Sequence, residues 1–286
     1  MTFIVLVIKW ATNSMSTMKF YIKSDLKQLV LLIILHTCTI HINKFILSVL
    51  GFTYPTVFQG WQTLVAVILM RILLIEELKP ISWTSFYSNL PLFLCFVANI
   101  VAGSKALSSL PVPVVVALSN VVPVLINTLG DHQLGKNYIN FIASLLAVLS
   151  SICIFLVDSV LMEKGIPAMW MILHILFLGA QCLADIRTSS AFSSFDRLFY
   201  CNLFSVVVLA PSSLYLEEAF LALHFQKRSQ LSFLLGCVMS GILGTVMSLI
   251  TSSPTPNSLN IAAIAKAVSC LVSPYILPCK WFQIVQ

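Results

Sequence analysis

Long apolar runs constrain the fold of this chain more than any other feature of its sequence. Each run is about as long as the roughly 20-residue helix that crosses the hydrocarbon core of a bilayer. Polar residues or Pro and Gly residues separate the runs, so we expect antiparallel helices joined by short connections. The predicted spans are 29–50, 55–75, 89–108, 113–130, 138–157, 168–186, 199–216, 231–251 and 258–277.

The composition excludes a soluble domain. Hydrophobic residues make up 59% of the chain and charged residues 9%, whereas a soluble domain carries about 25% charged residues. The net charge of +6 is spread over connections and spans, and it forms no basic cluster of the kind that nucleic acid requires. The fold class is therefore an all-α membrane protein, a multi-span helical bundle surrounded by the lipid bilayer, with no nucleic-acid partner.

The positions of the basic residues predict the orientation of the chain in the membrane. Most lysines and arginines outside the spans lie in connections on the same side as the N-terminus. Cytosolic connections carry an excess of these residues. We therefore expect residues 1–28 to form a cytosolic N-terminal segment.

Two connections read alike and indicate an internal repeat. GSKALSSLPVP (103–113) joins the third and fourth spans, and TSSPTP (251–256) joins the eighth and ninth. In each, a serine-containing turn leads to Pro-x-Pro at the start of a helix, where proline is favoured. The equivalent positions predict a first five-helix half over 29–157 and a second half of four helices over 168–277, followed by a tail over 278–286. Because five is odd, the second half would be inverted in the membrane, an arrangement typical of secondary transporters with a site between the halves.

Three lysines lie within or at the ends of spans, and Lys266 is the deepest of them. A lysine at mid-depth costs about 2.5–3.5 kcal/mol unless it has a partner or a watery cavity. Lys44 and Lys105 lie nearer the ends of their spans, so we expect their long side chains to reach the headgroups. Asp185 lies at the end of a span beside Arg187, with which we expect it to pair. With no obvious carboxylate partner, Lys266 indicates an anionic ligand, and phosphate is the natural candidate.

Other polar residues inside the spans are further candidates for substrate binding. Tyr200 and Asn202, in LFYCNL (198–203), combine an aromatic ring with an amide, as a nucleobase requires. The alternative is an interfacial aromatic and a hydrogen bond between helices. Asn43, Asn120 and Ser258 complete the predicted site, although an amide in a span more often joins two helices.

The sequence contains no sign of catalytic or metal chemistry. The cysteines lie mainly inside apolar runs at no repeated spacing, as small hydrophobic residues do. No nucleophile–base pair, phosphate-binding loop or paired carboxylates occur. We therefore expect neither an enzyme nor a cofactor.

Three ordered motifs resemble one family: SKALSSLPVP (104–113), SFDRLFYCN (194–202) and TSSPTPNSLNIAAIAK (251–266). They are similar to motifs of the Golgi nucleotide-sugar transporters of the drug/metabolite transporter superfamily, in the GDP-mannose-transporter-like group. FTYPTVFQGWQTL (52–64) is similar to the vertebrate branch of that group.

The resemblance implies a fold and a function. The family has ten helices in two inverted halves and exchanges a cytosolic nucleotide sugar for a luminal nucleoside monophosphate by alternating access. The resemblance implies a multi-pass protein of the Golgi membrane, with the endoplasmic reticulum as the alternative location. It also implies that the protein can form a homodimer. UDP-N-acetylglucosamine and GDP-mannose both fall within the family's substrates.

The family's binding motifs are only partly kept. Phe199–Asn202 matches the family's FYNN, with Cys201 in place of its first asparagine. Residues 262–266 match GALNK, and of its glycine, asparagine and lysine only the lysine, Lys266, remains. The pair Asn43 and Lys44 matches an asparagine–lysine pair of the family's first helix. The resemblance therefore assigns the phosphates to Lys266.

Two functional hypotheses follow. After the ninth predicted span the chain continues only from Pro278 to Gln286, so we expect the family's tenth helix to be missing. The first hypothesis is a nucleotide-sugar antiporter. The second is a transport-inactive or regulatory membrane protein, a truncated variant that associates with a full-length transporter.

Overall fold

A computed structural model describes residues 23–73, 78–130, 165–188, 193–252, 265, 266, 268 and 269, and these residues form helices and their connections. The elements are α2 (Lys23–Lys44), the π-helix η1 (Phe45–Val49), α3 (Pro55–Leu73), α4 (Trp83–Ser109), α5 (Val112–Gly130), α8 (Gly165–Thr188), α9 (Ser194–Tyr215), α10 (Glu218–Leu223) and α11 (Leu231–Thr251).

Within the described ranges, six helices are long and apolar enough to cross a membrane, which confirms the multi-span helical bundle. They cover the predicted spans at 29–50, 55–75, 89–108, 168–186, 199–216 and 231–251. The span predicted at 113–130 is also helical, with a shorter apolar segment over Val112–Val122. The span predicted at 138–157, the second Pro-x-Pro turn and most of 258–277 lie outside the described residues.

Two helices begin earlier than their apolar runs because serine caps extend them. Helix α4 starts at Trp83, where the Ser82 hydroxyl accepts a hydrogen bond from Ser85 N at 3.2 Å. Helix α9 starts one residue after Ser193, whose hydroxyl accepts from Asp196 N at 3.1 Å. Such a side chain satisfies an N–H group that has no partner within the helix. The hydrophobic pattern alone therefore placed both starts too late.

The buried carboxylate of Asp196 fastens the segment before α4 to the start of α9. Its Oδ2 accepts from the Ser193 hydroxyl at 2.7 Å, and its Oδ1 accepts from Lys79 N at 3.0 Å. The Tyr200 hydroxyl, one turn along α9, donates to Lys79 O at 2.6 Å. Residues far apart in the sequence thereby hold α4 and α9 together at one end of the bundle.

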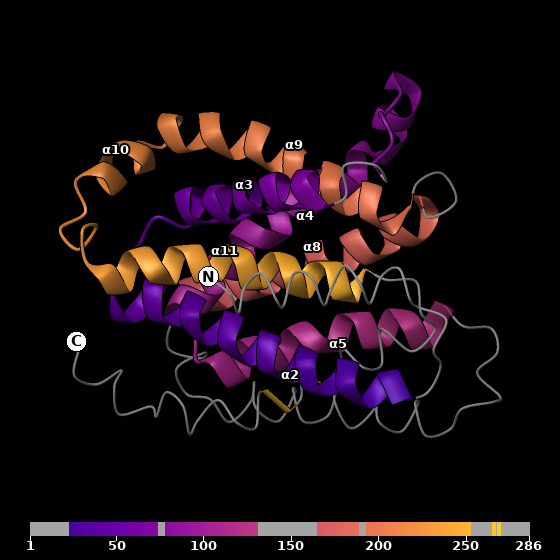
Figure 1. Ribbon diagram of the computed structural model, residues 1–286, viewed down its shortest axis with the longest axis horizontal. Coiled ribbons are helices and arrows are strands. Elements are labelled where there is room, and N and C mark those ends of the chain that lie inside the picture. Colours follow the sequence, from indigo (N-terminus) through magenta and orange to yellow (C-terminus); the bar gives the residue numbers. More distant parts are fainter. Residues whose placement is uncertain are drawn as a thin grey trace.

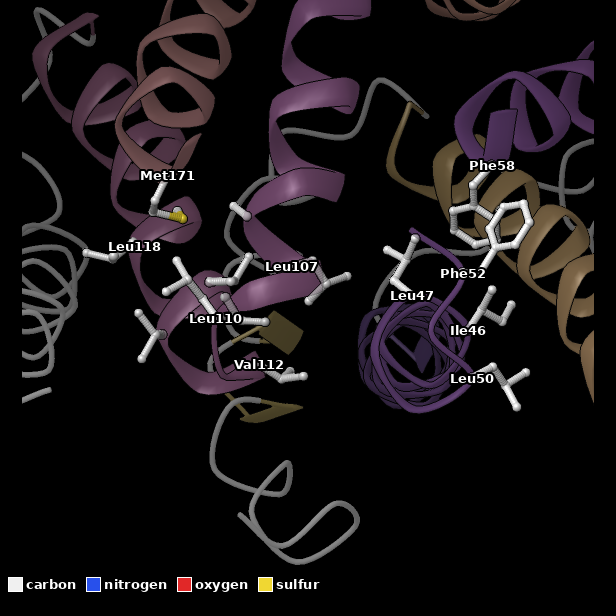
Figure 2. Packing of buried hydrophobic residues seen from close by; sticks show 14 of the residues in the cluster. Ile46, Leu47, Leu50, Phe52, Phe58, Leu107, Leu110, Val112, Leu118 and Met171 are labelled. Carbon is white, nitrogen blue, oxygen red and sulfur yellow. The ribbon is translucent and has the colours of Figure 1, made fainter. Parts of the chain in front are cut away.

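The helices pack as a bundle in which α4 lies along α8, α3 lies between α9 and α11, and α2 lies beside α11 (Figure 1). The main hydrophobic cluster sits where η1 and the segment up to Phe58 meet the α4–α5 turn. Figure 2 shows Ile46, Leu47 and Phe52 on one side and Leu107 and Leu110 on the other. This packing fixes the first helices around the space described below.

The position of Lys44 in the sequence predicted that its side chain reaches the headgroups, and this prediction is wrong. The side chain is fully buried near the main hydrophobic cluster. Its Nζ donates to Leu107 O at 2.7 Å, to Ser108 O at 3.3 Å and to Leu110 O at 2.8 Å. The last carbonyls of a helix have no partner within it and carry partial negative charge. The buried end of α4 therefore supplies the partners that the ammonium group needs.

Two other charged groups also have partners that were not predicted. Asp185 pairs with Arg197 of α9 at 2.7 Å rather than with its neighbour Arg187. The Nζ of Lys105 lies 4.8 Å from the ring centroid of Trp170 in α8. Both contacts join helices, so these charges also contribute to the packing of the bundle.

A polar cavity with one lysine as the candidate functional site

A cavity of about 340 Å³ lies among α2, α3, α4, α5, α8, α9 and α11. Most of its surface is apolar, like the helices that form it, but polar side chains from several helices also line it. The polar lining residues are His36, Thr39, Asn43, Gln59, Gln62, Thr63, Asn99, Ser104, Ser119, His174, Asn202, Ser240, Thr245, Ser248 and Lys266. A cavity of this size is within the range of small-molecule sites.

Lys266 is the one lysine or arginine among the described lining residues, which include no aspartate or glutamate. Within the described part of the chain its ammonium group forms no hydrogen bond and no ion pair. A cation inside a bundle of apolar helices is costly without an anion, and an anionic ligand would remove that cost. The lysine makes this cavity a candidate site for a negatively charged ligand.

A hydrogen-bonded group from three helices forms one wall of the cavity. The Oδ1 of Asn43 accepts from Gln62 Nε2 at 3.1 Å and from the Ser240 hydroxyl at 2.5 Å, and Gln62 Nε2 also contacts the Ser240 hydroxyl. These bonds hold α2, α3 and α11 in register. They also leave the Asn43 amide nitrogen and the Gln62 oxygen without partners among the described residues, so both can bind a neutral polar group.

The predicted site residues are placed unequally. Asn43, Asn202 and Lys266 line the cavity, and Asn202 also donates to Leu198 O at 2.7 Å. Tyr200 lies outside the lining because its hydroxyl is held by Lys79 O. Asn120 is buried in α5, also outside the lining, and Ser258 lies outside the described residues. The structure thus brings together half of the predicted set.

Several lining residues were not predicted, although their spacing carried a signal. His36, Thr39 and Asn43 follow one another at intervals of three and four residues, and Gln62 and Thr63 lie three and four residues after Gln59. Residues at such intervals share one face of a helix. A search for polar residues at helical spacing within each apolar run would have found both faces.

His174 of α8 closes another part of the wall. Its Nδ1 lies 3.1 Å from Asn99 O, and its Nε2 lies 3.0 Å from the Ser119 hydroxyl. The ring packs directly on Gly103 of α4, where an added Cβ would come within 2.9 Å of two ring atoms. A glycine at 103 therefore allows the histidine to join α4, α5 and α8.

We expect Gly103→Ala to displace the His174 ring and to destabilise the protein. Overpacking of this kind costs about 1–3 kcal/mol, which corresponds to a fall in melting temperature of roughly 2–10 °C. Thermal unfolding in detergent measures the change. Gly60→Ala is the matched control because its Cβ would meet only Leu209 Cβ, at an ordinary 3.7 Å. An equal melting temperature in the two variants would contradict the proposed fit of the ring.

The described residues contain no cluster of His, Cys, Asp or Glu that could hold a metal ion. In the described part of the chain, membrane-spanning helices surround a cavity that is lined by polar side chains and by a lysine whose ammonium group has no partner among these residues. Polar sites inside such bundles are typical of transporters.

Curated relatives assign the chain to a family. It is 35% identical over 222 residues to the UDP-N-acetylglucosamine transporter TMEM241 of Mus musculus, which covers 73% of this chain and 72% of the relative. It is 34% identical over 220 residues to the TMEM241 homolog of Xenopus laevis, over 72% of this chain and 71% of the relative. The GDP-mannose transporter of Kluyveromyces lactis is 29% identical over 196 residues, which are 62% of this chain and 58% of that protein.

The chain therefore belongs to the nucleotide-sugar transporter family. No family model matches it. The relatives are named as transporters, which confirms the expectation that the chain is not an enzyme.

Proposed function

We propose that the protein transports a nucleotide sugar across the Golgi membrane in exchange for a luminal nucleoside monophosphate. The observation that supports this most directly is Lys266, a cation that has no anionic partner among the described residues and lines a cavity between membrane-spanning helices. Lysine binds phosphate as a point charge, and the relatives are named for solutes that contain a diphosphate.

The lining residues divide naturally by the part of the substrate they would bind. Lys266 neutralises charge on the diphosphate. Asn43, Gln62 and Asn202 offer amide groups for the uncharged ends, the nucleoside and the sugar. Tyr200 is not needed for this arrangement, because its hydroxyl is bound at the end of α9.

Exchange follows from the charge of the empty cavity. A bare ammonium group is harder to carry through a closed, dry intermediate than one that is paired with phosphate. The free-energy barrier between the outward-open and inward-open states is therefore lower when a ligand is bound in each direction. Alternating access by two inverted halves, each of which the structure describes only in part, provides the movement.

UDP-N-acetylglucosamine is the first candidate substrate and GDP-mannose the second. The relatives named for the former are 34–35% identical to this chain, and those named for the latter are 26–29% identical.

Uptake into proteoliposomes tests the proposal. Vesicles that contain the purified protein are preloaded with UMP or GMP, and labelled UDP-N-acetylglucosamine and GDP-mannose are supplied outside. We expect saturable uptake of one sugar nucleotide that depends on the matching monophosphate inside. Uptake that is equal with and without internal monophosphate would contradict exchange, and no uptake of either compound would contradict transport.

Location, orientation and assembly are tested separately. We expect a tagged protein to colocalise with a Golgi marker rather than with an endoplasmic-reticulum marker, and an N-terminal tag to be cleaved by protease added to sealed vesicles. Light scattering of the detergent-solubilised protein distinguishes the proposed homodimer from a monomer.

The second candidate function is a regulatory partner of a full-length transporter. It is motivated by Cys201 and by the loss of the glycine and asparagine of the family motif over 262–266. Stability of the purified protein against a panel of nucleotide sugars separates the two candidates. A rise in melting temperature with one compound supports the transporter, and its absence together with copurification of a second transporter supports the partner.

A further inference from the structure

His36 of α2 lines the same cavity as Lys266 and is joined to the segment that carries it. The Nδ1 of His36 lies 2.7 Å from the hydroxyl oxygen of Ser269. That hydroxyl donates to Lys266 O at 2.8 Å, and Ser269 is fully buried. The three residues therefore form one connected group at the wall of the cavity.

The hydrogen bonds of Ser269 assign the proton on the His36 ring. A hydroxyl group has one hydrogen, and that of Ser269 is used on Lys266 O. His36 Nδ1 must therefore donate to Ser269. In a neutral imidazole the other nitrogen, Nε2, is then an acceptor, and it has no partner among the described residues.

The charges around His36 oppose protonation of Nε2 while the cavity is empty. Lys266 is the nearby cation, and His41 on the same helix and His174 in the cavity wall are the other titratable groups that face it. Helix α11 contributes serine, threonine and glycine to the lining, and α5 contributes valine and serine. No carboxylate offsets the lysine among the described lining residues.

A bound diphosphate reverses this balance. The diphosphate of a nucleotide sugar carries two negative charges, and Lys266 supplies one positive charge. An uncompensated charge inside the helical bundle is costly, and a proton on Nε2 would supply both the second positive charge and an N–H donor to a phosphate oxygen.

We propose that His36 is a second phosphate-binding residue, which takes up one proton from water when a nucleotide sugar enters the cavity and returns it to water when the nucleotide leaves. The inference rests on the proposed function. It makes binding of the nucleotide sugar tighter at lower pH.

The pH dependence of uptake tests the proposal in proteoliposomes. A nucleotide sugar is the right probe because its diphosphate has no titration near neutrality, unlike a phosphate monoester with a pKa of about 6. For the wild-type protein, linkage of one proton predicts that the KM for uptake rises up to about tenfold per pH unit in the alkaline part of a range from about pH 5.5 to 8. For His36→Asn, we expect a KM that does not change with pH and equals the alkaline value of the wild type.

The variants are chosen to separate protonation from packing. Asparagine keeps an N–H donor for Ser269 but has no group at the position of Nε2. If it does not fold, His36→Gln tests the same loss of a titratable group. His224→Asn is the control, since His224 lies exposed at the end of α10, and it should keep the wild-type profile.

Proton uptake measured directly on binding gives the decisive readout. Addition of the nucleotide sugar to detergent-solubilised wild type in weak buffer with a pH indicator should consume about one proton per ligand bound near neutral pH, and His36→Asn should consume none. Binding without proton uptake overturns the inference and leaves the proposed function intact. Proton uptake on binding that is kept in His36→Asn and lost in His174→Asn also overturns the inference. A wild-type protein that binds no nucleotide sugar overturns the proposed function and the inference together.

Discussion

Lys266→Met is expected to remove most nucleotide-sugar transport without lowering the stability of the protein. The variant has no lysine or arginine in the described lining of the cavity to receive the diphosphate. A hydrogen bond to a charged group is worth about 1.5–3 kcal/mol, so kcat/KM for uptake should fall by roughly 10- to 100-fold. Proteoliposome uptake at limiting nucleotide sugar measures this loss.

Stability is the second readout of the same variant. The ammonium group of Lys266 has no partner in the described part of the chain, so its replacement by an apolar side chain of similar length removes a burial cost. The melting temperature of the empty protein should therefore be unchanged or higher. Addition of a nucleotide sugar should no longer raise the melting temperature of this variant. Full transport by Lys266→Met would disprove the phosphate role, and a large loss of stability would show that the lysine is structural.

Lys44→Met is expected to give the opposite result, a large loss of stability. The side chain is fully buried, and its three hydrogen bonds satisfy the carbonyls of Leu107, Ser108 and Leu110. Methionine fills much of the same space but removes the bonds to Leu107 O and Leu110 O, whereas Ser108 O keeps the Ser48 hydroxyl as a donor at 2.6 Å. An acceptor that is left unpaired costs about 1–3 kcal/mol before the structure relaxes. A fall in melting temperature of about 5–10 °C is therefore expected.

Lys105→Met is the matched control for this variant. It removes the same charge from the neighbouring helix, but its ammonium group only lies over the Trp170 ring, a contact worth about 0.5–1 kcal/mol at an exposed site. Thermal unfolding in detergent without ligand compares the two. Equal melting temperatures for Lys44→Met and Lys105→Met would show that the bonds to the end of α4 contribute little.

Lys266 and Lys44 also show where prediction from the sequence succeeded and where it failed. The deep position of Lys266 without a nearby carboxylate indicated an anionic ligand, and the structure places it in a polar cavity. The position of Lys44 near the end of its span suggested that it reaches the headgroups, and this was wrong. Its partners lie 63, 64 and 66 residues further along the chain. No local pattern around Lys44 contains that information.

Tyr200 and Asn202 show the same limit within one helix. They are two residues apart in α9 and therefore point to different sides of it. Asn202 lines the cavity, whereas Tyr200 is held by Lys79 O. The motif placed both at the site because its similarity to the family does not specify which way each side chain points.

By itself, the sequence determined that this is a helical membrane protein and where six of its spans lie, because bilayer thickness and the need to pair backbone groups act on each segment separately. The capping serines at 82 and 193 adjusted the starts of two of them. The tertiary structure alone decided which polar residues share the cavity, such as His36 with Lys266, and which are used to close a helix end, such as Lys44. The physical reason is that a buried polar group needs a partner close in space, and in a bundle that partner comes from another helix far along the chain.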